Sequence, residues 1–467
     1  MFATVEIPIW LLALIVLFAI VTLASHFLFP SVRWFFRKRA ERLVARLNER
    51  LERPIEPFKL ARRHDMIQRL IYDPQVAQAI ALHSDTEGVP ENVAFEMARR
   101  YAREIVPSFS ASAYFGFGTR ISRWFARAMY NVDDGQDRAE KLSQVNPDST
   151  VIYVMNHRSN MDYMLVTYLA AQSQALSYAV GEWARVWPLS QLIRSMGAYF
   201  IRRKSRNALY RKVLARYVQL ATAGGVAQAV FPEGGLSLDG KLQPPKMGLL
   251  NYIASGAKDQ TRDVVFVPVG LNYDRVLEDR LLIAADRSGQ RRFPARMGVV
   301  AQFTLRKLWQ RLRGKFLRFG YAAVHYGAPL SLAAFGKDRP VEELAQELMR
   351  RIGEVVPVLP VPLLARVLLL ADGPISKTAL RAAFEDALAR LPAEKVTIVV
   401  QGQPGVFDAA LAHVTKRRLV SDNRHGISIA EDERATLRFY ANSIDQHFSN
   451  DAAAAQKLAM RDIKLQK

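Results

Sequence analysis

The sequence of 467 residues contains no cysteine. Disulfide bonds and thiolate metal sites are therefore excluded, and a cysteine nucleophile is excluded with them. A chain without cysteine fits a reducing compartment, where disulfides would not persist. The sequence also lacks the G-x-S-x-G motif, in which a serine nucleophile occupies a sharp strand-to-helix turn.

Acidic residues are few in comparison with basic ones. The chain has 65 Lys and Arg against 44 Asp and Glu, which gives a formal net charge of +21. A surplus of this size favours acidic partners such as anionic membrane lipids, phosphorylated substrates, acidic carrier proteins or nucleic acid. No nucleic-acid recognition module is visible, so we expect no nucleic-acid partner. A merely basic, solvated surface is the alternative interpretation.

Long hydrophobic runs are also rare, although half of all residues are hydrophobic. Only residues 9–29 form a run without Asp, Glu, Lys or Arg that is long enough to cross the hydrocarbon core of a bilayer. Basic residues from Arg33 to Arg42 follow this run and Glu6 precedes it, so the positive-inside rule places the body of the protein in the cytoplasm. A cleaved signal peptide, the alternative, would need a basic start and a shorter apolar core.

Strand and helix patterns alternate in the middle of the chain. Helical patterns begin at Asp162 and at Asn207. This alternation predicts an α/β fold with a mixed, mostly parallel sheet flanked by helices. The strand patterns lie at residues 150–155, 197–202, 226–231, 264–271 and 321–326.

Four regions are expected from these patterns. A basic juxtamembrane helix over residues 37–53, stopped by Pro54, follows the apolar run. Turn signals near residues 133–135 and 146–148 separate a helical region from the α/β region. The four regions are a transmembrane anchor with its basic helix at 1–53, a helical domain at 54–145, an α/β domain at 146–335 and a helical C-terminal region at 336–467.

Three later segments carry weaker signals. Residues 302–319 form a basic amphipathic pattern, which predicts a helix lying either on a membrane surface or on the protein core. Residues 358–370 are apolar but contain Pro360, Pro362 and Arg366, so they are expected to be buried or interfacial, not a second span. Residues 396–400 favour a short strand.

A histidine and an aspartate stand five residues apart at a predicted strand-to-helix junction. His157 follows the first strand pattern, and Asp162 lies in the first turn of the helix. A carboxylate bonded to one imidazole nitrogen leaves the other nitrogen able to accept a proton, which would activate a hydroxyl group. Since no nucleophile motif is nearby, direct attack by a substrate hydroxyl is expected. The spacing alone also fits a helix-capping Asp beside a surface His.

Further candidate residues follow the next strands, each with a structural alternative. Arg202 and Arg203 end a strand and suit a phosphate, or form a solvated strand end. The segment 231–248 carries candidate ligands for substrate hydroxyls and phosphate, or is only a long turn. Pro268 suggests a strand end or edge that lines an acyl-chain groove, although plain core is the alternative. The ligands in 231–248 are Glu233 for hydroxyls, and Lys241 and Lys246 for phosphate.

These four blocks, in this order, resemble the motifs of the glycerolipid acyltransferase superfamily, and most closely its glycerol-3-phosphate acyltransferase branch. The resemblance extends upstream over residues 73–130 and downstream to the pattern LRFYANSI at residues 437–444. The four blocks read HRSNMDYMLVTY, GAYFIRR, FPEGG with the later PPKMG, and VFVPVGLNYDRVLE.

The resemblance implies transfer of a fatty acyl group from acyl-CoA or acyl-carrier protein to the sn-1 hydroxyl of glycerol 3-phosphate, the first step of phospholipid synthesis. It implies that His157 is the general base and Asp162 its orienting partner. No metal or other cofactor is expected. Substrate-binding roles are implied for Arg158, Ser159, Gly197, Arg202, Arg203, Glu233, Gly234, Ser237 and Pro268, with Lys241 and Lys246 as further phosphate ligands.

One departure bears on the acyl acceptor. The branch usually has Glu-Gly-Gly-Arg-Ser-Arg in its third motif, but here Leu236 and Leu238 replace both arginines. The acceptor phosphate would then be bound by other cations, or the acceptor would be 1-acyl-glycerol 3-phosphate (lysophosphatidate). The other candidate cations are Arg202, Arg203, Lys241 and Lys246. A non-catalytic protein that binds membrane lipid or an acyl carrier is a further alternative. The expected location is a bacterial-type inner (plasma) membrane, with a single N-terminal span and the catalytic body in the cytoplasm.

Overall fold

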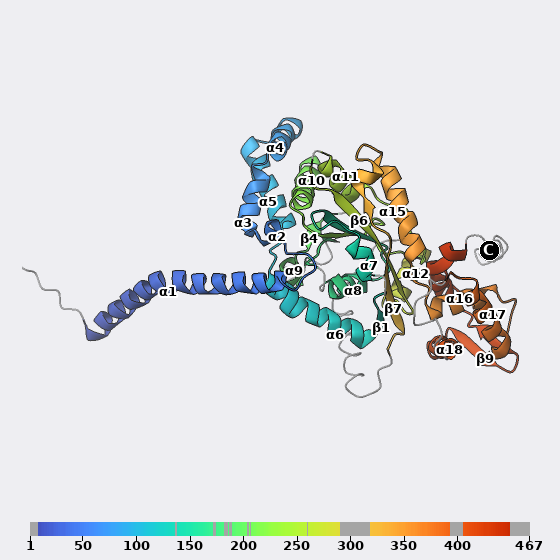
Figure 1. The fold of residues 1–467 in the computed structure, drawn as a ribbon. Helices are drawn as coiled ribbons and strands as arrows, with labels where there is room; N and C mark the ends of the chain where they lie inside the picture. Colours follow the sequence, from blue (N-terminus) through green and yellow to red (C-terminus); the bar gives the residue numbers. More distant parts are fainter. Residues whose placement is uncertain are drawn as a thin grey trace, which may run out of the picture. The chain divides into compact units, whose positions relative to one another are not determined.

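The computed structural model of this chain describes residues 8–135, 138–170, 174–181, 185, 189–202, 205, 207–258, 260–289, 318–392 and 405–448. The chain divides into two units, Met1–Ile55 and Glu56–Lys467. Figure 1 shows the elements of each unit along the sequence.

The described part of the first unit contains the helix α1 (Ile9–Asn48). This helix continues through Pro30 and includes residues 37–48 of the predicted juxtamembrane helix. It also ends at Asn48, before the predicted stop at Pro54. Searched over the described residues, the structure has no helix that is both long and apolar enough to cross a membrane, and the predicted span at 9–29 is not confirmed.

The second unit begins with a helical segment, as predicted. Asp73 caps the start of α4 by accepting a hydrogen bond from the Gln75 amide at 3.0 Å. Gly88 ends this helix in the left-handed conformation with φ +64°. The elements are α2 (Pro57–Leu60), α3 (Arg63–Ile71), α4 (Pro74–Glu87), α5 (Glu91–Ile105), a π-helix (Ser112–Gly118) and α6 (Thr119–Met129).

An eight-stranded sheet with the order β1-β7-β6-β2-β5-β3-β4 forms the centre of this unit, and β8 pairs with β6. The pairs of β2 with β5 and β6, of β3 with β4 and β5, and of β1 with β7 are parallel, whereas β7 and β8 run antiparallel to β6. The predicted mixed, mostly parallel sheet is therefore confirmed. The strands are β1 (Asn131–Asp133), β2 (Thr150–Met155), β3 (Ser177–Gly181), β4 (Tyr199–Ile201), β5 (Gln228–Val230), β6 (Val264–Tyr273), β7 (Tyr321–Tyr326) and β8 (Leu330–Ser331).

Side chains alternate between two cores on the two faces of this sheet. Ile152 and Val154 of β2 belong to a core formed with α10, α11 and α15, which Figure 1 shows on one side of the sheet. Tyr153 and Met155 belong to a second core with α6, α8 and α16. The helices around the sheet are α7 (Arg138–Ser143), α8 (Met161–Ala170), α9 (Leu189–Ser195), α10 (Ala208–Ala223), α11 (Gly248–Ala257), α12 (Asp279–Ser288), α14 (Leu332–Phe335) and α15 (Val341–Val355).

The C-terminal region is built around α16 (Pro360–Leu370), which is buried from Pro360 to Leu369. The prediction that residues 358–370 are buried or interfacial is confirmed, and the charge of Arg366 is paired with Asp445 at 2.7 Å. Around α16 lie α17 (Lys377–Ala389), α18 (Val406–Lys416), the hairpin β9 (Val420–Asn423) and β10 (Gly426–Ile429), α19 (Arg434–Ala441) and a 3-10 helix (Asn442–Phe448).

Some predictions are not tested by these observations. The predicted strand at residues 396–400 and nearly all of the predicted basic helix at 302–319 lie outside the described residues. The four predicted region boundaries also stay predictions.

Candidate active site

The loop that carries His157 is fastened to the sheet by the residue before it. The buried side chain of Asn156 donates to the Leu271 carbonyl at 2.9 Å and accepts from the Leu271 amide at 2.7 Å. This side-chain amide thus continues the pairing of β2 with β6 beyond the last strand residue. The loop therefore begins at a fixed point at the carboxyl end of a central strand, where α/β folds present ligand-binding residues.

The structure brings His157 and Asp162 together. His157 Nδ1 lies 2.8 Å from Asp162 Oδ2, and the two side chains are 3% and 0% exposed. The Asp162 carboxylate also accepts from the amides of Arg158 at 2.7 Å and Ser159 at 3.1 Å. Since Asp162 occupies the first turn of α8, the helix dipole further favours its negative charge. The alternative of a surface histidine is excluded by this burial.

Aromatic rings fix the plane of the imidazole. Phe231 stacks on His157 with 4.2 Å between ring centroids, and Tyr163 meets it edge-on at 5.4 Å. Within the described part of the chain, Nε2 of His157 has no hydrogen-bond partner, while Nδ1 is bonded to Asp162. Nε2 is therefore the nitrogen that can take a proton from a substrate.

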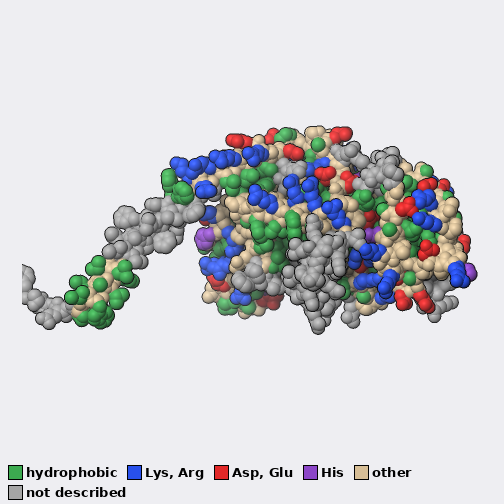
Figure 2. All heavy atoms as spheres, turned by 90° about the horizontal axis from the view of Figure 1, so that it is seen from below, with side chains coloured by type: hydrophobic (Ala, Val, Ile, Leu, Met, Phe, Trp, Pro, Cys, Tyr) green, Lys and Arg blue, Asp and Glu red, His purple; other side chains and the backbone are tan. Residues whose placement is uncertain are grey.

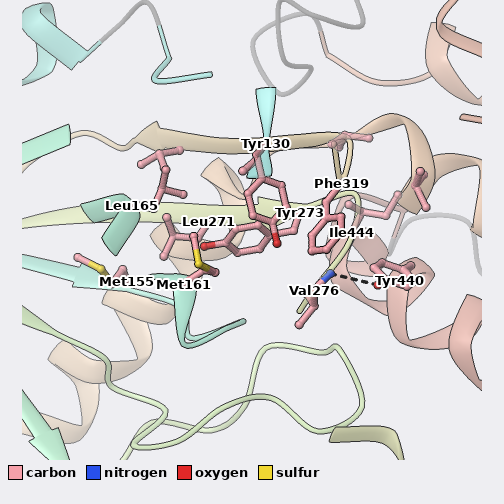
Figure 3. Packing of buried hydrophobic residues seen from close by; sticks show 14 of the residues in the cluster. Tyr130, Met155, Met161, Leu165, Leu271, Tyr273, Val276, Phe319, Tyr440 and Ile444 are labelled. Atoms are coloured by element: carbon pink, nitrogen blue, oxygen red, sulfur yellow. Dashed lines mark hydrogen bonds between the residues drawn. The ribbon is translucent and has the colours of Figure 1, made fainter. Parts of the chain in front are cut away.

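Tyr273, at the end of β6, is a contact of this pair that sequence reasoning missed. Its buried hydroxyl donates to Asp162 Oδ1 at 2.5 Å. Burial, with a further contribution from the Asp162 carboxylate, raises the pKa of Tyr273 well above its ordinary value, so the hydroxyl stays a donor. Figure 3 shows Tyr273 close to Tyr130 in the buried cluster, with 5.4 Å between their rings.

Glu278 holds the other side of the loop and was also missed. Its carboxylate accepts from the Ser159 hydroxyl at 2.8 Å, from the Asn160 amide at 2.7 Å and from the Asn160 side chain at 2.8 Å. Burial raises the pKa of Glu278 from its ordinary value, and the bonds from Ser159 and Asn160 oppose that shift. Ser159, predicted to bind substrate, thus has its hydroxyl committed to Glu278.

Glu233 connects the first and third sequence blocks. One carboxylate oxygen accepts from the His157 amide at 2.8 Å and the other from the Gln243 amide at 2.9 Å. Burial raises the pKa of Glu233 to about 7, against the lowering effect of these two bonds. Both oxygens of Glu233 therefore hold backbone amides in place, and its contact with a substrate hydroxyl stays a prediction.

The glycine and serine beside Glu233 also shape the loop. The Ser237 amide donates to the His157 carbonyl at 3.0 Å, and its buried hydroxyl donates to the Lys241 carbonyl at 2.7 Å. Gly234 has φ +65°, and a Cβ there would lie 2.7 Å from the Lys246 side chain. Both residues therefore serve the close packing of the third block against the first.

Arg158 is buried directly beside the pair of His157 and Asp162. One guanidinium nitrogen donates to the Gly240 carbonyl, and the group lies 5.2 Å from the centre of the Phe439 ring. Among the described residues, its Nε and Nη2 atoms have no hydrogen-bond partner. Burial lowers the pKa of Arg158 from its usual value.

The structure places the second block away from the first. Arg202 and Gly197 flank β4, which lies at the sheet edge and is separated from β2 by β3 and β5. Arg202, with a side chain 33% exposed, forms two hydrogen bonds with Glu104 at 2.9 and 2.7 Å, which raise the pKa of the guanidinium. Gly197 (φ +88°) packs against Phe109 and Lys59. Arg203 lies outside the described residues.

The prediction that Pro268 marks a strand end or edge is wrong. Pro268 is buried in the middle of β6, opposite Val154 of the central strand β2. The proline is tolerated there because β7 pairs from Val269 onward and β8 pairs at Phe266, so residue 268 faces the bend between those strands. Gly327 in that bend donates its amide to the Pro268 carbonyl at 2.8 Å.

The third block presents leucines to the core and lysines to solvent. Leu238 is buried in the core and Leu236 packs partly buried against it. Lys241 and Lys246 are exposed.

Over the described residues, no group of three or more His, Cys, Asp or Glu side chains is arranged to hold a metal ion. The arrangement as a whole places a buried histidine, oriented by a buried carboxylate, at the carboxyl end of a parallel strand, where its imidazole could accept a proton.

Comparison with known proteins assigns two stretches of the chain. The family model "Acyltransferase" matches residues 137–272, and that of the "Glycerol-3-phosphate acyltransferase C-terminal region" matches residues 305–466. Proteins named glycerol-3-phosphate acyltransferase are similar: one from Pseudomonas putida is 27% identical over 85% of this chain and 50% of its own, and one from Pseudomonas paraeruginosa is 29% identical over 71% and 40%. The chain thus spans about half the length of the curated relatives it matches.

Among solved structures, the 1-acyl-sn-glycerophosphate acyltransferase of Thermotoga maritima aligns with 59% of this chain and 92% of its own. Its sequence identity is 18% and the TM-score is 0.32.

Proposed function

Because this chain belongs to the glycerol-3-phosphate acyltransferase branch of the acyltransferase superfamily, we propose that it transfers a fatty acyl group from acyl-CoA or acyl-carrier protein to the sn-1 hydroxyl of glycerol 3-phosphate. The observation that carries the proposal is the buried contact of His157 Nδ1 with Asp162 at 2.8 Å, with Nε2 left to accept a proton.

In the proposed reaction, His157 Nε2 removes the proton of the acceptor hydroxyl as its oxygen attacks the thioester carbonyl. The carbon–oxygen bond forms, the tetrahedral intermediate collapses, and the carbon–sulfur bond breaks. The departing thiolate takes the proton from the imidazolium and leaves as a thiol. Asp162 stabilises the imidazolium, and the donors around its carboxylate keep that charge in place.

The acceptor phosphate needs a cation that the third block does not supply at its usual positions. Leu236 and Leu238 are part of the core or pack against it, so the exposed Lys241 and Lys246 are the proposed phosphate ligands. Arg202 would have to exchange Glu104 for a phosphate to take part. The second candidate acceptor is 1-acyl-glycerol 3-phosphate, which the replacement of two arginines by leucines favours.

The proposed location is a bacterial-type inner membrane, with residues 9–29 as the anchor and the catalytic unit on the cytoplasmic side. The exposed apolar side chains at the start of α1, such as Trp10 and Phe18, support a lipid-facing role for this segment. The basic residues that follow it support the orientation. Acyl donor, acceptor and anionic lipid are the proposed partners.

The test is an acyl-transfer assay with mass analysis of the products. Wild-type protein is offered glycerol 3-phosphate and 1-acyl-glycerol 3-phosphate together, with acyl-CoA or acyl-carrier protein as donor. We expect the monoacyl product from glycerol 3-phosphate and its loss in His157→Ala. His83→Ala, which removes a buried histidine of α4, is the matched control and retains activity. Acyl transfer by folded His157→Ala at a rate near that of the wild type would contradict the proposal.

A further inference from the structure

The sequence pattern at residues 437–444 lies against the segment that follows β6. Tyr440, in α19, donates its hydroxyl to Asp279 Oδ2 at 2.6 Å and accepts from the Val276 amide at 3.1 Å. It also accepts from Arg417 Nη1 at 3.0 Å. A phenol has one donor and two acceptor positions, so this hydroxyl is fully engaged. Figure 3 shows the bond between Tyr440 and Val276.

The same contact carries a buried ion pair. Arg417 binds Asp279 with its other terminal nitrogen, and both side chains are largely buried. A buried charge pair with complete hydrogen bonds fixes one geometry, because any other arrangement leaves a charge without a partner. We call Tyr440, Arg417 and Asp279 the C-terminal clamp.

The residue next to the clamp holds the catalytic loop. Glu278 directly precedes Asp279, and its carboxylate binds Ser159 and Asn160 on the loop between His157 and Asp162. Fixing Asp279 therefore fixes the backbone from which Glu278 reaches that loop.

A second contact of the C-terminal region approaches the loop from the side of the third block. The Phe439 ring lies under the Arg158 guanidinium, and Asn442 donates to the Asp239 carbonyl at 2.8 Å. Gly240 (φ +89°) has no room for a side chain, since a Cβ would lie 2.0 Å from the Phe439 carbonyl oxygen. The C-terminal region thus touches the surroundings of His157 from two directions.

We propose that the C-terminal region is a positioning device for the catalytic loop, acting through the C-terminal clamp and Glu278. This inference rests on the proposed function. None of the clamp residues touches the reacting atoms. They keep the loop in the geometry in which His157 and Asp162 meet before substrate binds, so their loss slows the chemical step more than it weakens substrate binding.

The decisive variant is Tyr440→Phe, which removes one hydroxyl and leaves the Val276 amide without its partner. We expect kcat to fall about 10-fold or more, because small displacements of catalytic groups have effects of this size. The KM values of donor and acceptor should stay within about twofold, since that part of the site is not altered. Hydrogen–deuterium exchange of peptides covering residues 156–162 should become faster.

Tyr114→Phe is the matched control. The Tyr114 hydroxyl is also buried and also accepts from a backbone amide, that of Leu176 at 3.1 Å. Its loss should lower the thermal midpoint but leave kcat and the exchange of residues 156–162 unchanged. This comparison separates a positioning role from a general loss of stability.

The inference is overturned if Tyr440→Phe and Tyr114→Phe share the same kcat and the same loop exchange. If Tyr440→Phe does not fold, Arg417→Lys provides the same test with the charge retained. If the wild type acylates neither acceptor, the proposed function fails, while the exchange rate of residues 156–162 in the variants still decides the role of the clamp.

Discussion

Asp162 shows how a single buried carboxylate is held in one orientation beside a histidine. Its Oδ2 atom receives bonds from the His157 ring and from the amides of Arg158 and Ser159, whereas Oδ1 receives the Tyr273 hydroxyl. Both oxygens of this buried group therefore have hydrogen-bond partners. Tyr273 supplies the bond that prevents rotation of the carboxylate away from the imidazole.

Tyr273→Phe should therefore lower kcat by about 10-fold, within the range that general-base positioning contributes. Without the hydroxyl, the carboxylate can rotate away from the imidazole, so the base is held less often in its productive geometry. The measurement is kcat and KM for donor and acceptor. Tyr217→Phe, a buried tyrosine of α10 in the core on the other face of the sheet, is the control. A kcat of Tyr273→Phe equal to that of the wild type would rule out this role.

The buried carboxyl group of Asp274, which follows Tyr273 in the chain, should make the free energy of unfolding depend on pH. It accepts from the amides of Tyr321 at 2.8 Å and Val361 at 2.9 Å, and burial raises its pKa to about 7. The folded chain therefore keeps a proton that the unfolded chain, with a carboxyl pKa of about 4, has already lost. Stability should fall as pH rises from about 4 to about 7 and then level off, with this group contributing up to about 1.4 kcal/mol per pH unit.

Urea unfolding at several pH values checks this expectation. Asp274→Asn should have a shallower decline over the same window, even though the amide disrupts one backbone contact and lowers stability at every pH. Glu233, whose pKa burial also raises to about 7, keeps part of the slope in the variant. An unchanged slope in Asp274→Asn would contradict the assignment.

Among the elements, the parallel pairing of β2 with β6 sets the position of the loop that carries His157. Asn156 extends this pairing with two side-chain bonds to Leu271. Asn156→Ala leaves two buried backbone groups unpaired, so the free energy of unfolding should fall by about 2–4 kcal/mol. Chemical denaturation measures the change, and Asn146→Ala, at an exposed turn before β2, is the control. A loss below about 0.5 kcal/mol would show that the pairing is not needed.

The elements also show what local sequence patterns can and cannot predict. The strands at 150–155 and 321–326 have the predicted bounds, because apolar runs between turns define them without help from distant residues. β3, with the sequence SYAVG, was missed because only Tyr178 and Val180 in this short segment favour a strand, and it is stabilised by pairing with β4 and β5. β6 continues two residues beyond the predicted end, through Asn272 and Tyr273.

For the candidate site too, local sequence patterns predict only contacts between residues that are close in the chain. His157 and Asp162 are five residues apart, so a local motif was enough to suggest their contact. The contacts of residues 157–162 with Glu233, Tyr273 and Glu278 span 76 to 119 residues, and no spacing rule predicts such pairs. These three residues lay inside recognised blocks, but their partners became clear only when the sheet brought the blocks together.

For the whole molecule, the net charge of +21 predicts attraction to anionic surfaces. Figure 2 shows Lys and Arg side chains gathered among hydrophobic ones on one face. On α6, the exposed Arg120 and Arg127 lie near the exposed Trp124. The full chain should partition more strongly to vesicles that contain anionic lipid than to neutral ones. This difference should disappear near about 1 M salt, where the screening length is about 3 Å. Vesicle sedimentation provides the measurement, and equal partitioning at low salt would contradict it.

The C-terminal clamp also has a consequence for the time course of synthesis. Tyr440 emerges from the ribosome 161 residues after Asp279, the residue it binds. At about 5–20 residues per second, a nascent chain spends on the order of 10–30 seconds with β2 and β6 already made but the clamp absent. A chain still being translated should therefore have its histidine and aspartate in place, while the loop between them is fixed only after Tyr440 has been made.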